Sequence, residues 1–304
     1  MFIARLAPVT ANIKLGSGVT NLPSYHPAMI AGHVAMMDNM LDGRFIWGIG
    51  PGGLPSDIEI FGNREIDRNL KMVECFEQVM ELWWGEAPYN LKGDFYTGST
   101  EITFTPEIGQ GIVPKPLHKP HPPIVVSALA PHSQGITLAA ERDWHPISCQ
   151  YVQAHWVKTH LPKYLEGLAN AGKEPDPAGW RVAKCIFVSE DKTTALRYAK
   201  SADGPYGFYF SNLMKKLSGG GRLGLFGTYP DQPEEEITLE QSLETQVIAG
   251  TPESVAEQIL ALREEIGNFG TLVYTGLDWA DKDLSIKSME LMANQVMPKV
   301  NAAL

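Results

Sequence analysis

Three glycines in one short segment could bring the backbone close to a bound molecule. Gly48, Gly50 and Gly53 match the spacing G-x-G-x-x-G, which in dinucleotide-binding proteins follows a strand and runs directly into a helix. Here Pro51 and Pro55 fall where that helix would begin, and a periodic helical pattern starts only later. We therefore reject a Rossmann site. Two interpretations remain: the glycines admit a flat ligand beside the backbone, or they form a tight turn.

A second polar and glycine-containing segment ends the preceding apolar run. Gly16, Ser17 and Gly18 close that run, and His26 stands directly before Pro27 at the start of a helical pattern. The small residues either leave room for a ligand or simply end a strand. A histidine at a helix start is either a capping or packing residue or a catalytic group, and the sequence leaves both interpretations open.

A third candidate follows the apolar segment 123–128, where the chain continues as LAPHSQGITLAAE. Serine and glycine at the start of a helix leave backbone N–H groups free, and the helix dipole adds partial positive charge there. Such a helix start suits a phosphate group. The alternative is an ordinary capped helix.

Six short apolar segments, each followed by a loop and a helical pattern, predict buried parallel strands: 13–20, 44–50, 123–128, 144–149, 180–189 and 271–276. They are compatible with an α/β barrel that lacks two of its eight βα units, or with an open, doubly wound sheet. Segment 94–106 alternates like an antiparallel excursion. Segment 204–250 shows no clear strand, and its aromatic residues favour a lid over a disordered loop.

Composition narrows the class of protein. The chain has 304 residues, 44% of them hydrophobic, a net charge of −10 and three cysteines far apart in sequence. The negative charge argues against nucleic acid as a partner, and no apolar run is long enough for a membrane span. Neither a disulfide scaffold nor a metal site is indicated. The few, scattered cysteines favour a reducing compartment, and we therefore expect a cytoplasmic protein.

Taken together, these segments resemble the luciferase-like flavin monooxygenase superfamily. The similarity lies in LGSGVTNLPSYHP, in A-x-x-x-x-x-D-x-x-x-x-GRF, in the glycine loop GIGPGG with the following aspartate and FG, and in the C-terminal AGTPESVAEQI and QVMPKV. The loop GPGGLPSD is most similar to the limonene-monooxygenase-like branch. The resemblance implies a (β/α)8 TIM barrel of the bacterial luciferase type. We expect one such domain over residues 1–304, lacking its first two βα units, with a lid insertion at about 204–250.

The resemblance also implies which residues have a function. It implies a non-proline cis peptide at Gly18-Val19 beneath a flavin ring and a supporting role for His26. The expected cofactor-binding residues are Gly18, Val19, Gly50, Pro51, Gly52 and Gly53 for the ring and ribityl chain, and Ser127, Ala128, Leu129, Ser133 and Gly135 for the phosphate of FMN. Aromatic residues are expected to line an apolar substrate pocket: Tyr206, Phe208, Tyr209, Phe210 and Trp279.

Two departures from the family pattern stand out. Luciferase has an arginine in the glycine loop that helps to hold the phosphate, and this chain has Pro51 there. The motif that carries the main active-site histidine of the family, after its second strand, has no counterpart in this sequence. We therefore expect loose binding of reduced flavin and, if no residues precede Met1, weak or absent oxygenase activity.

The activity implied by the resemblance is oxidation of an apolar small molecule by O2 and reduced FMN (FMNH2). A separate NAD(P)H:flavin reductase is expected to supply the flavin, and the family implies a homodimer. FAD and F420 are possible cofactors too. The alternatives are an F420-dependent hydride transferase and a non-catalytic flavin-binding or subunit-like protein.

Overall fold

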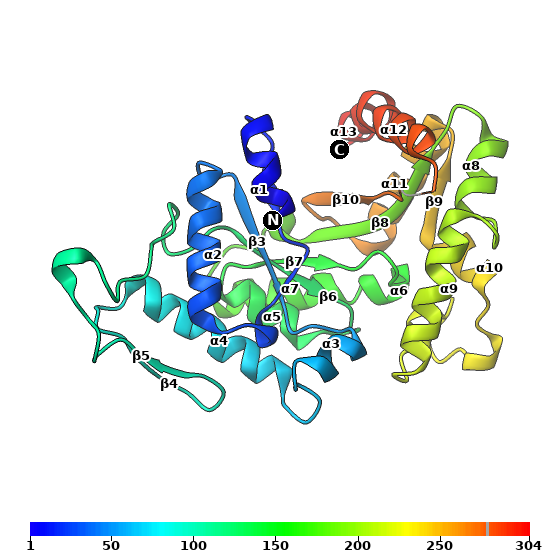
Figure 1. Cartoon of the computed structure of the whole chain (residues 1–304). Helices are drawn as coiled ribbons and strands as arrows, with labels where there is room; N and C mark the ends of the chain where they lie inside the picture. The colour runs from blue at the N-terminus through cyan, green and yellow to red at the C-terminus, as the bar shows by residue number, and fades with distance from the viewer. Residues whose placement is uncertain (278–279) are drawn as a thin grey trace. The chain divides into compact units, whose positions relative to one another are not determined.

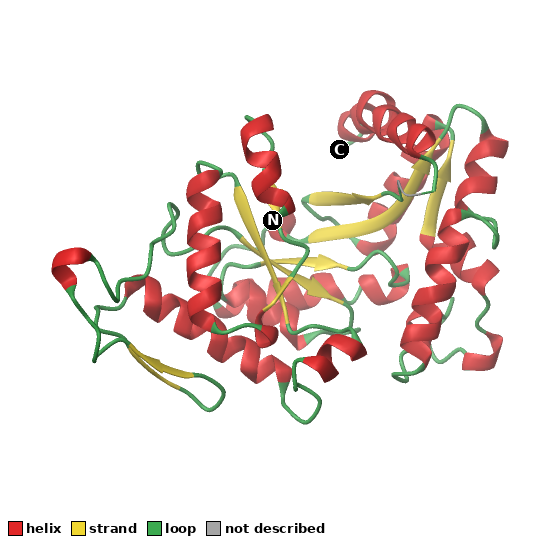
Figure 2. Cartoon of the chain, viewed as in Figure 1, coloured by secondary structure: helices red, strands yellow, loops and turns green. Residues whose placement is uncertain are grey.

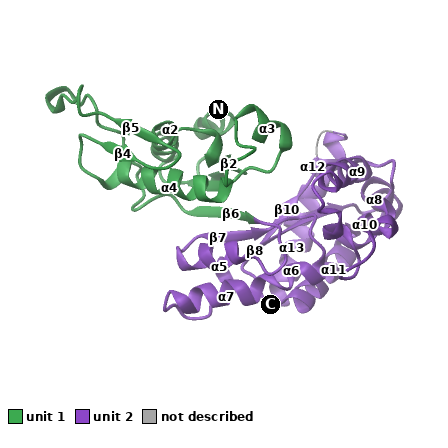
Figure 3. Ribbon diagram, turned by 90° about the horizontal axis from the view of Figure 1, so that it is seen from below, with its two compact units in different colours: residues 1–127 green, residues 128–304 purple. Residues whose placement is uncertain are grey.

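Parallel strands followed by helices make up most of the chain (Figures 1 and 2). The computed structural model describes residues 1–277 and 280–304. The chain divides into two compact units, residues 1–127 and 128–304 (Figure 3). That the whole chain forms one barrel domain stays a prediction.

The first unit contains four α-helices, three short 3₁₀ helices and six strands among its described residues. The α-helices are α1 (Phe2–Leu6), α2 (Pro27–Met40), α3 (Pro55–Ile60) and α4 (Arg68–Trp84), and the 3₁₀ helices are Ala7–Val9, Leu22–Ser24 and Pro106–Ile108. The strands are β1 (Leu15–Gly16), β2 (Thr20–Asn21), β3 (Phe45–Gly50), β4 (Asn90–Lys92), β5 (Thr97–Ser99) and β6 (Ile124–Ala128), of which β6 ends at the boundary between the units.

Strand β3 is the centre of the parallel pairing in this unit. Its first half pairs with β1 and its last residues pair with β2, so that one predicted strand is interrupted between Gly16 and Thr20. On its other side β3 pairs with β6, with Trp47 opposite Ile124. The side chain of Trp47 is fully buried against Trp83 of α4 (ring centroids 5.7 Å apart). The indole of Trp83 in turn donates to the carbonyl of Ala31 in α2, which ties the two helices together.

An antiparallel hairpin, β4 and β5, leaves the parallel sheet in the region where the sequence predicts an excursion. Glu74 of α4 holds its turn, because the carboxylate accepts hydrogen bonds from the backbone N–H groups of Asp94, Phe95 and Tyr96 at 2.8–3.0 Å. Gln78, one helical turn further, donates to the carbonyl of Tyr96. The hairpin is therefore attached to α4 through polar contacts at its turn.

The second unit contains the remaining elements. The α-helices are α5 (Gln134–Glu141), α6 (Ala154–Val157), α7 (His160–Asn170), α8 (Lys192–Ala199), α9 (Pro205–Ser218), α10 (Leu239–Gln246), α11 (Pro252–Ile266), α12 (Lys282–Leu291) and α13 (Met297–Ala302), with a π-helical turn at Met292–Val296. Short 3₁₀ helices lie at Pro177–Gly179, Leu223–Phe226 and Glu234–Glu236, and the strands are β7 (His145–Ser148), β8 (Arg181–Val188), β9 (Val247–Gly250) and β10 (Thr271–Thr275).

Strand β8 is the central strand of this unit. It pairs in parallel with β7, β9 and β10. Successive side chains of a strand point to opposite faces, and the two faces of β8 contribute to two different apolar cores. Val182, Ile186 and Val188 pack into one core, while Cys185 and Phe187 pack into the other.

The six predicted strand segments all contain strands, but the expectation for 204–250 is wrong in one respect. The segment ends in a buried strand, β9, where the sequence shows no clear strand. The rest of the segment forms α9, α10 and two 3₁₀ helices rather than an unstructured loop. Whether it acts as a lid stays a prediction.

Candidate functional site

The interruption between β1 and β2 contains the predicted cis peptide bond. The bond between Gly18 and Val19 is cis, which confirms the expectation drawn from the resemblance. Ser17 fixes the segment to β3, because its hydroxyl donates to the carbonyl of Gly48 (2.9 Å) and accepts from the N–H of the same residue (3.0 Å). Thr20 donates to that hydroxyl as well. Val19 is about a third exposed.

This close approach of the chain to itself requires glycine at position 48 and leaves little room for a side chain at Gly50. A Cβ atom on Gly48 would lie 1.8 Å from the carbonyl oxygen of Ser17, and one on Gly50 would lie 3.0 Å from Cγ2 of Val19. Gly18 and Gly53 differ, since a Cβ on either would face open space. Part of this region therefore offers bare backbone next to an open volume, against which a flat ligand can lie.

The glycine loop is held from α4. Asp67 caps that helix by accepting from the N–H groups of Asn69 and Leu70. The next residue, Arg68, donates from its guanidinium to the carbonyl of Gly52. Sequence reasoning missed Arg68, because nothing in its local pattern shows that it turns back sixteen residues to this loop. Pro51 leaves the loop without the arginine of luciferase, and Arg68 places a cation against it from a different element.

His26 occupies the N-cap position of α2, and its Nδ1 accepts a hydrogen bond from the N–H of Ala28 at 3.2 Å. This contact matches the capping interpretation. An accepting Nδ1 leaves the proton of the neutral ring on Nε2. The exposed ring also packs edge-on against Tyr96, with ring centroids 5.9 Å apart. A supporting role at a cofactor stays a prediction, and Nε2 is the atom that could perform it.

Ser127, at the end of β6, lies near the glycine strand. Its Oγ is 3.9 Å from the position of a Cβ on Gly50, and the residue is exposed. Three segments distant in sequence, which contribute Val19, Gly50 and Ser127, therefore meet at one place in the first unit. The resemblance implies a place at the flavin ring and ribityl chain for Val19 and Gly50 and at the phosphate for Ser127, and these roles stay predictions.

In the second unit, a buried histidine fixes the connection between β6 and α5. The Nδ1 of His160 lies 2.8 Å from the hydroxyl of Ser148, and its Nε2 lies 3.0 Å from the carbonyl oxygen of Ala130. The indole N–H of Trp180 donates to Ser148 at 2.9 Å. Because the carbonyl can only accept, Nε2 carries the proton and Nδ1 accepts from Ser148. Burial lowers the pKa of His160 to about 4, so the ring is neutral at physiological pH.

The start of α5 retains polar groups without a capping partner. The N–H of His132, which has the left-handed conformation (φ 51°), donates to the hydroxyl of Thr159. Ser133 is the N-cap residue of α5, and its hydroxyl makes no capping bond to the helix. The first turn of α5, which includes Gly135, follows directly. These are the groups expected to hold a phosphate.

A cavity of about 460 Å³ lies beside this connection, within the second unit. Leu129, Ala130 and Pro131 form one wall, and residues 221–234 contribute Arg222, Asp231 and Glu234 to another. Arg222 stands in the sequence GGGR, which matches no ligand-binding motif and so does not mark this residue as part of a cavity.

The aromatic residues that were expected to line a substrate pocket differ in how deeply they are buried. Tyr206 and Phe210 are fully buried in an apolar core, and the hydroxyl of Tyr206 donates to the carbonyl of Ile186. This burial favours packing over contact with a substrate. Phe208 is largely exposed. The hydroxyl of Tyr209 accepts from Gln150, and burial raises the pKa of Tyr209 to about 12. Trp279 lies outside the described residues, and the pocket assignment stays a prediction.

Among the described residues, no group of three or more His, Cys, Asp and Glu side chains could hold a metal ion. No helix in the same part of the chain combines the length and apolarity that crossing a bilayer requires.

Comparisons with known proteins agree with the resemblance. The profile of a family described as luciferase-like monooxygenase matches residues 1–268. Limonene 1,2-monooxygenase of Rhodococcus erythropolis is 30% identical over 307 residues, which cover 100% of this chain and 73% of that protein. These matches confirm the resemblance to the luciferase-like monooxygenase family and the similarity to limonene monooxygenase within it.

Solved structures show the same fold. The oxygenating constituent of 3,6-diketocamphane monooxygenase from Pseudomonas putida, a type II Baeyer-Villiger monooxygenase in complex with FMN, superposes with a TM-score of 0.84 at 27% identity, covering 98% of this chain and 82% of that one. A coenzyme F420-dependent tetrahydromethanopterin reductase from Methanopyrus kandleri gives a TM-score of 0.67 at 21% identity, with 97% and 86% covered. The predicted α/β fold of the luciferase type is thereby confirmed.

Proposed function

Because the chain belongs to the luciferase-like monooxygenase family and is an oxidoreductase of that type, we propose that it is the oxygenating component of a two-component flavin monooxygenase. Its reaction would be the oxidation of an apolar small molecule by O2 with reduced FMN. A separate NAD(P)H:flavin reductase would deliver the flavin in the cytoplasm. The observation that carries the proposal is the open backbone surface at Gly18, next to Val19, which lies close to Gly50 and Ser127. We also propose a homodimer.

The residues present fit a flavin. A planar ring can lie against backbone that carries no side chain, and Gly18 and Gly53 offer such surfaces. We assign Gly18, Val19 and the loop from Gly50 through Pro51 and Gly52 to Gly53 to the ring and ribityl chain. We assign the phosphate to Ser127, Ala128, Leu129, Ser133 and Gly135. Support for FMN comes from the Pseudomonas putida enzyme, whose structure contains it.

When bound, reduced FMN supplies the electrons that activate O2, and the protein supplies binding, orientation and exclusion of water. The capping bond of His26 uses Nδ1, so the Nε2–H of this exposed ring can donate a hydrogen bond to an oxygen atom. Tyr209 stays protonated because burial raises its pKa to about 12, so it can donate but not act as a base at neutral pH. Tyr209 therefore cannot remove a proton from a substrate at neutral pH.

The experiment that tests this proposal supplies reduced FMN from an added reductase and follows O2 consumption, substrate loss and hydrogen peroxide separately. Terpenes, cyclic ketones and aldehydes are suitable apolar substrates. We expect product to form with at least one of them, with peroxide reduced in proportion. Catalase and a reaction without the protein are the controls. Release of peroxide alone with every substrate would contradict the oxygenase proposal and support a non-catalytic flavin-binding protein.

The cofactor that the protein uses distinguishes an oxygenase from the alternative, an F420-dependent hydride transferase. Stopped-flow spectra of the protein with reduced FMN and with reduced F420 would show which one is oxidised, and by what. Oxidation of F420 by an organic acceptor without O2 would favour the alternative. We expect only reduced FMN to react, and only with O2 present.

A further inference from the structure

Gln150 and Tyr209 form a polar pair beside an apolar core of the second unit. The amide nitrogen of Gln150 donates to the hydroxyl of Tyr209 at 2.6 Å. Both residues are half-buried, and Tyr209 packs against the core that contains Cys185 and Phe187 of β8. The hydroxyl of a tyrosine in such a place normally has hydrogen-bond partners for its polar tip. The groups that this hydroxyl can still bind therefore determine what the pair can recognise.

The hydroxyl of Tyr209 has a hydrogen left to donate. A phenol is both a donor and an acceptor, and the bond from Gln150 uses its oxygen as the acceptor. Within residues 1–277 and 280–304, no acceptor binds the hydroxyl hydrogen. Burial raises the pKa of Tyr209 to about 12, so the hydrogen is present at neutral pH. The pair therefore presents one unused donor.

The surroundings of this donor are uncharged. Apart from burial and Gln150, the groups that act on the pKa of Tyr209 are the thiols of Cys185 and Cys149. Burial raises the pKa of both thiols to about 12, so neither is ionised at neutral pH. None of these groups is a cation, so a phosphate or carboxylate would be buried here without a counter-charge, which is costly. A neutral acceptor such as a carbonyl oxygen suits this donor, and the apolar neighbours suit a hydrocarbon skeleton.

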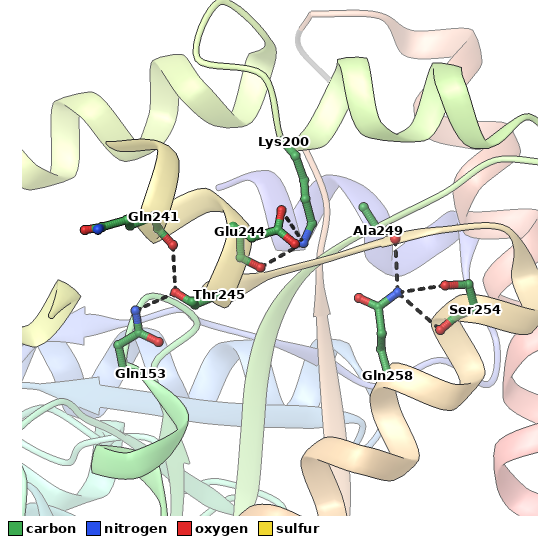
Figure 4. A network of polar contacts seen from close by, with 8 residues as sticks. All are labelled: Gln153, Lys200, Gln241, Glu244, Thr245, Ala249, Ser254 and Gln258. Carbon is green, nitrogen blue, oxygen red and sulfur yellow. Dashed lines mark hydrogen bonds and ion pairs between the residues drawn. The ribbon is translucent and has the colours of Figure 1, made fainter. Parts of the chain in front are cut away.

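The loop after β7 holds Gln150 in place. Lys184 of β8 donates to the carbonyl of Val152 at 3.1 Å. The next residue, Gln153, donates to the hydroxyl of Thr245 in α10 at 2.7 Å (Figure 4). Gln150 therefore lies two and three residues from positions that are bonded to β8 and to α10.

Helix α9 holds Tyr209 in place from its own side. Tyr206, three residues earlier, is fully buried and donates to the carbonyl of Ile186 at 2.8 Å. Phe210, the next residue, is fully buried as well, and its ring meets that of Tyr209 edge-on with centroids 5.7 Å apart. A donor that is already held in position loses little conformational freedom when it binds a ligand.

We propose that Tyr209 donates its hydroxyl hydrogen to the carbonyl oxygen of an apolar ketone or aldehyde, that Gln150 orients the phenol for this bond, and that the bond selects carbonyl compounds over hydrocarbons of the same shape. The inference rests on the proposed function, because it names the class of its substrate. Tyr209 thereby has a polar task in place of the apolar lining that the resemblance implies. Gln150, which no motif marks in the sequence, becomes a positioning residue.

The test compares cyclooctanone with methylenecyclooctane, which keeps the shape and replaces the carbonyl oxygen by a CH2 group. Binding of each to the full chain without flavin is measured by isothermal titration calorimetry. We expect Tyr209→Phe to weaken binding of the ketone about fivefold, as loss of one neutral hydrogen bond does, and to change binding of the hydrocarbon less than about twofold. Tyr229→Phe is the matched control, because it removes an exposed hydroxyl that donates to Glu236, and it should change neither affinity.

The positioning role of Gln150 has a test of its own. In Gln150→Glu at pH 8 the carboxylate would accept the hydrogen of Tyr209, so the ketone should lose affinity as it does in Tyr209→Phe. Gln150→Leu leaves the hydroxyl hydrogen free but not oriented, and the loss should be smaller. Unchanged ketone affinity in Gln150→Glu would overturn the role of Gln150.

The infrared carbonyl stretch of bound cyclooctanone reports the hydrogen bond directly. It should lie at lower frequency in the wild type than in an apolar solvent, and Tyr209→Phe should abolish the shift. Equal loss of both ligands in Tyr209→Phe, loss of neither, or a carbonyl frequency that this variant leaves unchanged would overturn the assignment. If the wild type binds neither ligand, this inference fails, while the oxygenase assay with reduced FMN still decides the proposed function. Selective ketone binding without product in that assay would contradict the proposed function and keep Tyr209 as a binding residue.

Discussion

His160 predicts a specific acid sensitivity of the second unit. The ring is buried and neutral, with Nδ1 accepting from Ser148 and Nε2–H donating to Ala130. Protonation would place a hydrogen on Nδ1, where the hydroxyl hydrogen of Ser148 already points. That hydroxyl also accepts from Trp180, so the whole series of bonds would have to rearrange.

The magnitude follows from the two pKa values. The ordinary pKa of histidine is 6.5 and the folded value is about 4. Each unit of difference corresponds to about 1.4 kcal/mol, so the maximal effect is about 3 kcal/mol. The unfolded state binds the proton first as the pH falls. The free energy of unfolding is therefore unaffected by His160 above pH 6.5, falls between pH 6.5 and 4, and has lost the full amount below pH 4.

The assay measures the free energy of unfolding of the second unit by urea at intervals from pH 7.5 to 4. His160→Gln retains an amide donor for Ala130 but does not titrate, so its stability should be lower at pH 7.5 and less dependent on pH. His33→Gln, which replaces an exposed histidine of α2, is the matched control and should behave like the wild type. The reasoning is refuted if His160→Gln retains the full pH dependence of the wild type, or if NMR shows the His160 ring titrating near pH 6.5.

Three further changes have expected outcomes of different kinds. Burial lowers the pKa of Lys184 to about 8, and its amine donates to the carbonyl of Val152. Lys184→Met should therefore raise the melting temperature at pH 7. Between pH 8 and 10.5 unfolding of the wild type takes up a proton, so its stability rises with pH there, and the variant should lack this rise. Gly48→Ala would place a Cβ 1.8 Å from the carbonyl of Ser17, and we expect it to cost several kcal/mol, about 3 or more, in chemical denaturation. Glu74→Gln removes the charge that three backbone N–H groups share; it should destabilise the hairpin turn by about 1–3 kcal/mol and speed proteolysis there.

Matched variants separate these effects from general ones. Lys192→Met changes an exposed lysine and should leave the pH dependence unchanged. Gly53→Ala places its methyl group in open space and should preserve stability. Glu77→Gln lies on the exposed side of the same helix as Glu74 and should not affect cleavage of the hairpin. An equal effect of any control and its partner would contradict the corresponding explanation.

The sequence located strands well because buried parallel strands are short apolar runs that end at glycine or polar residues. Each of the six segments contains a strand. It missed β9, since the four residues VIAG follow α10 directly and lie within a segment dominated by aromatic and polar residues. Which face of α4 is buried does not follow from its sequence either. Leu70 is largely exposed, while Cys75 and Val79 are buried, because the actual neighbours of the helix set which face is covered.

Site residues were predictable where a local motif marks them. Val19, Gly50 and Ser127 stand at three recognisable strand ends, although the sequence did not predict that Ser127 lies near Gly50. Arg68 and His160 act on carbonyl groups sixteen and thirty residues away, and no periodicity or motif reports such contacts. Arg222 belongs to the same class, because its neighbours in the cavity come from several elements.

The peptide bond between Ala130 and Pro131 offers a ligand no free hydrogen-bonding group. Its carbonyl is engaged by the imidazole of His160, and its nitrogen, being that of proline, carries no hydrogen. This one peptide bond therefore has no donor to offer, and its acceptor is already in use. Hydrogen bonds to a ligand in the cavity have to come from other groups, among them the side chains of Arg222, Asp231 and Glu234. A substitution of Pro131 should therefore alter which ligand shapes fit more than which functional groups are recognised.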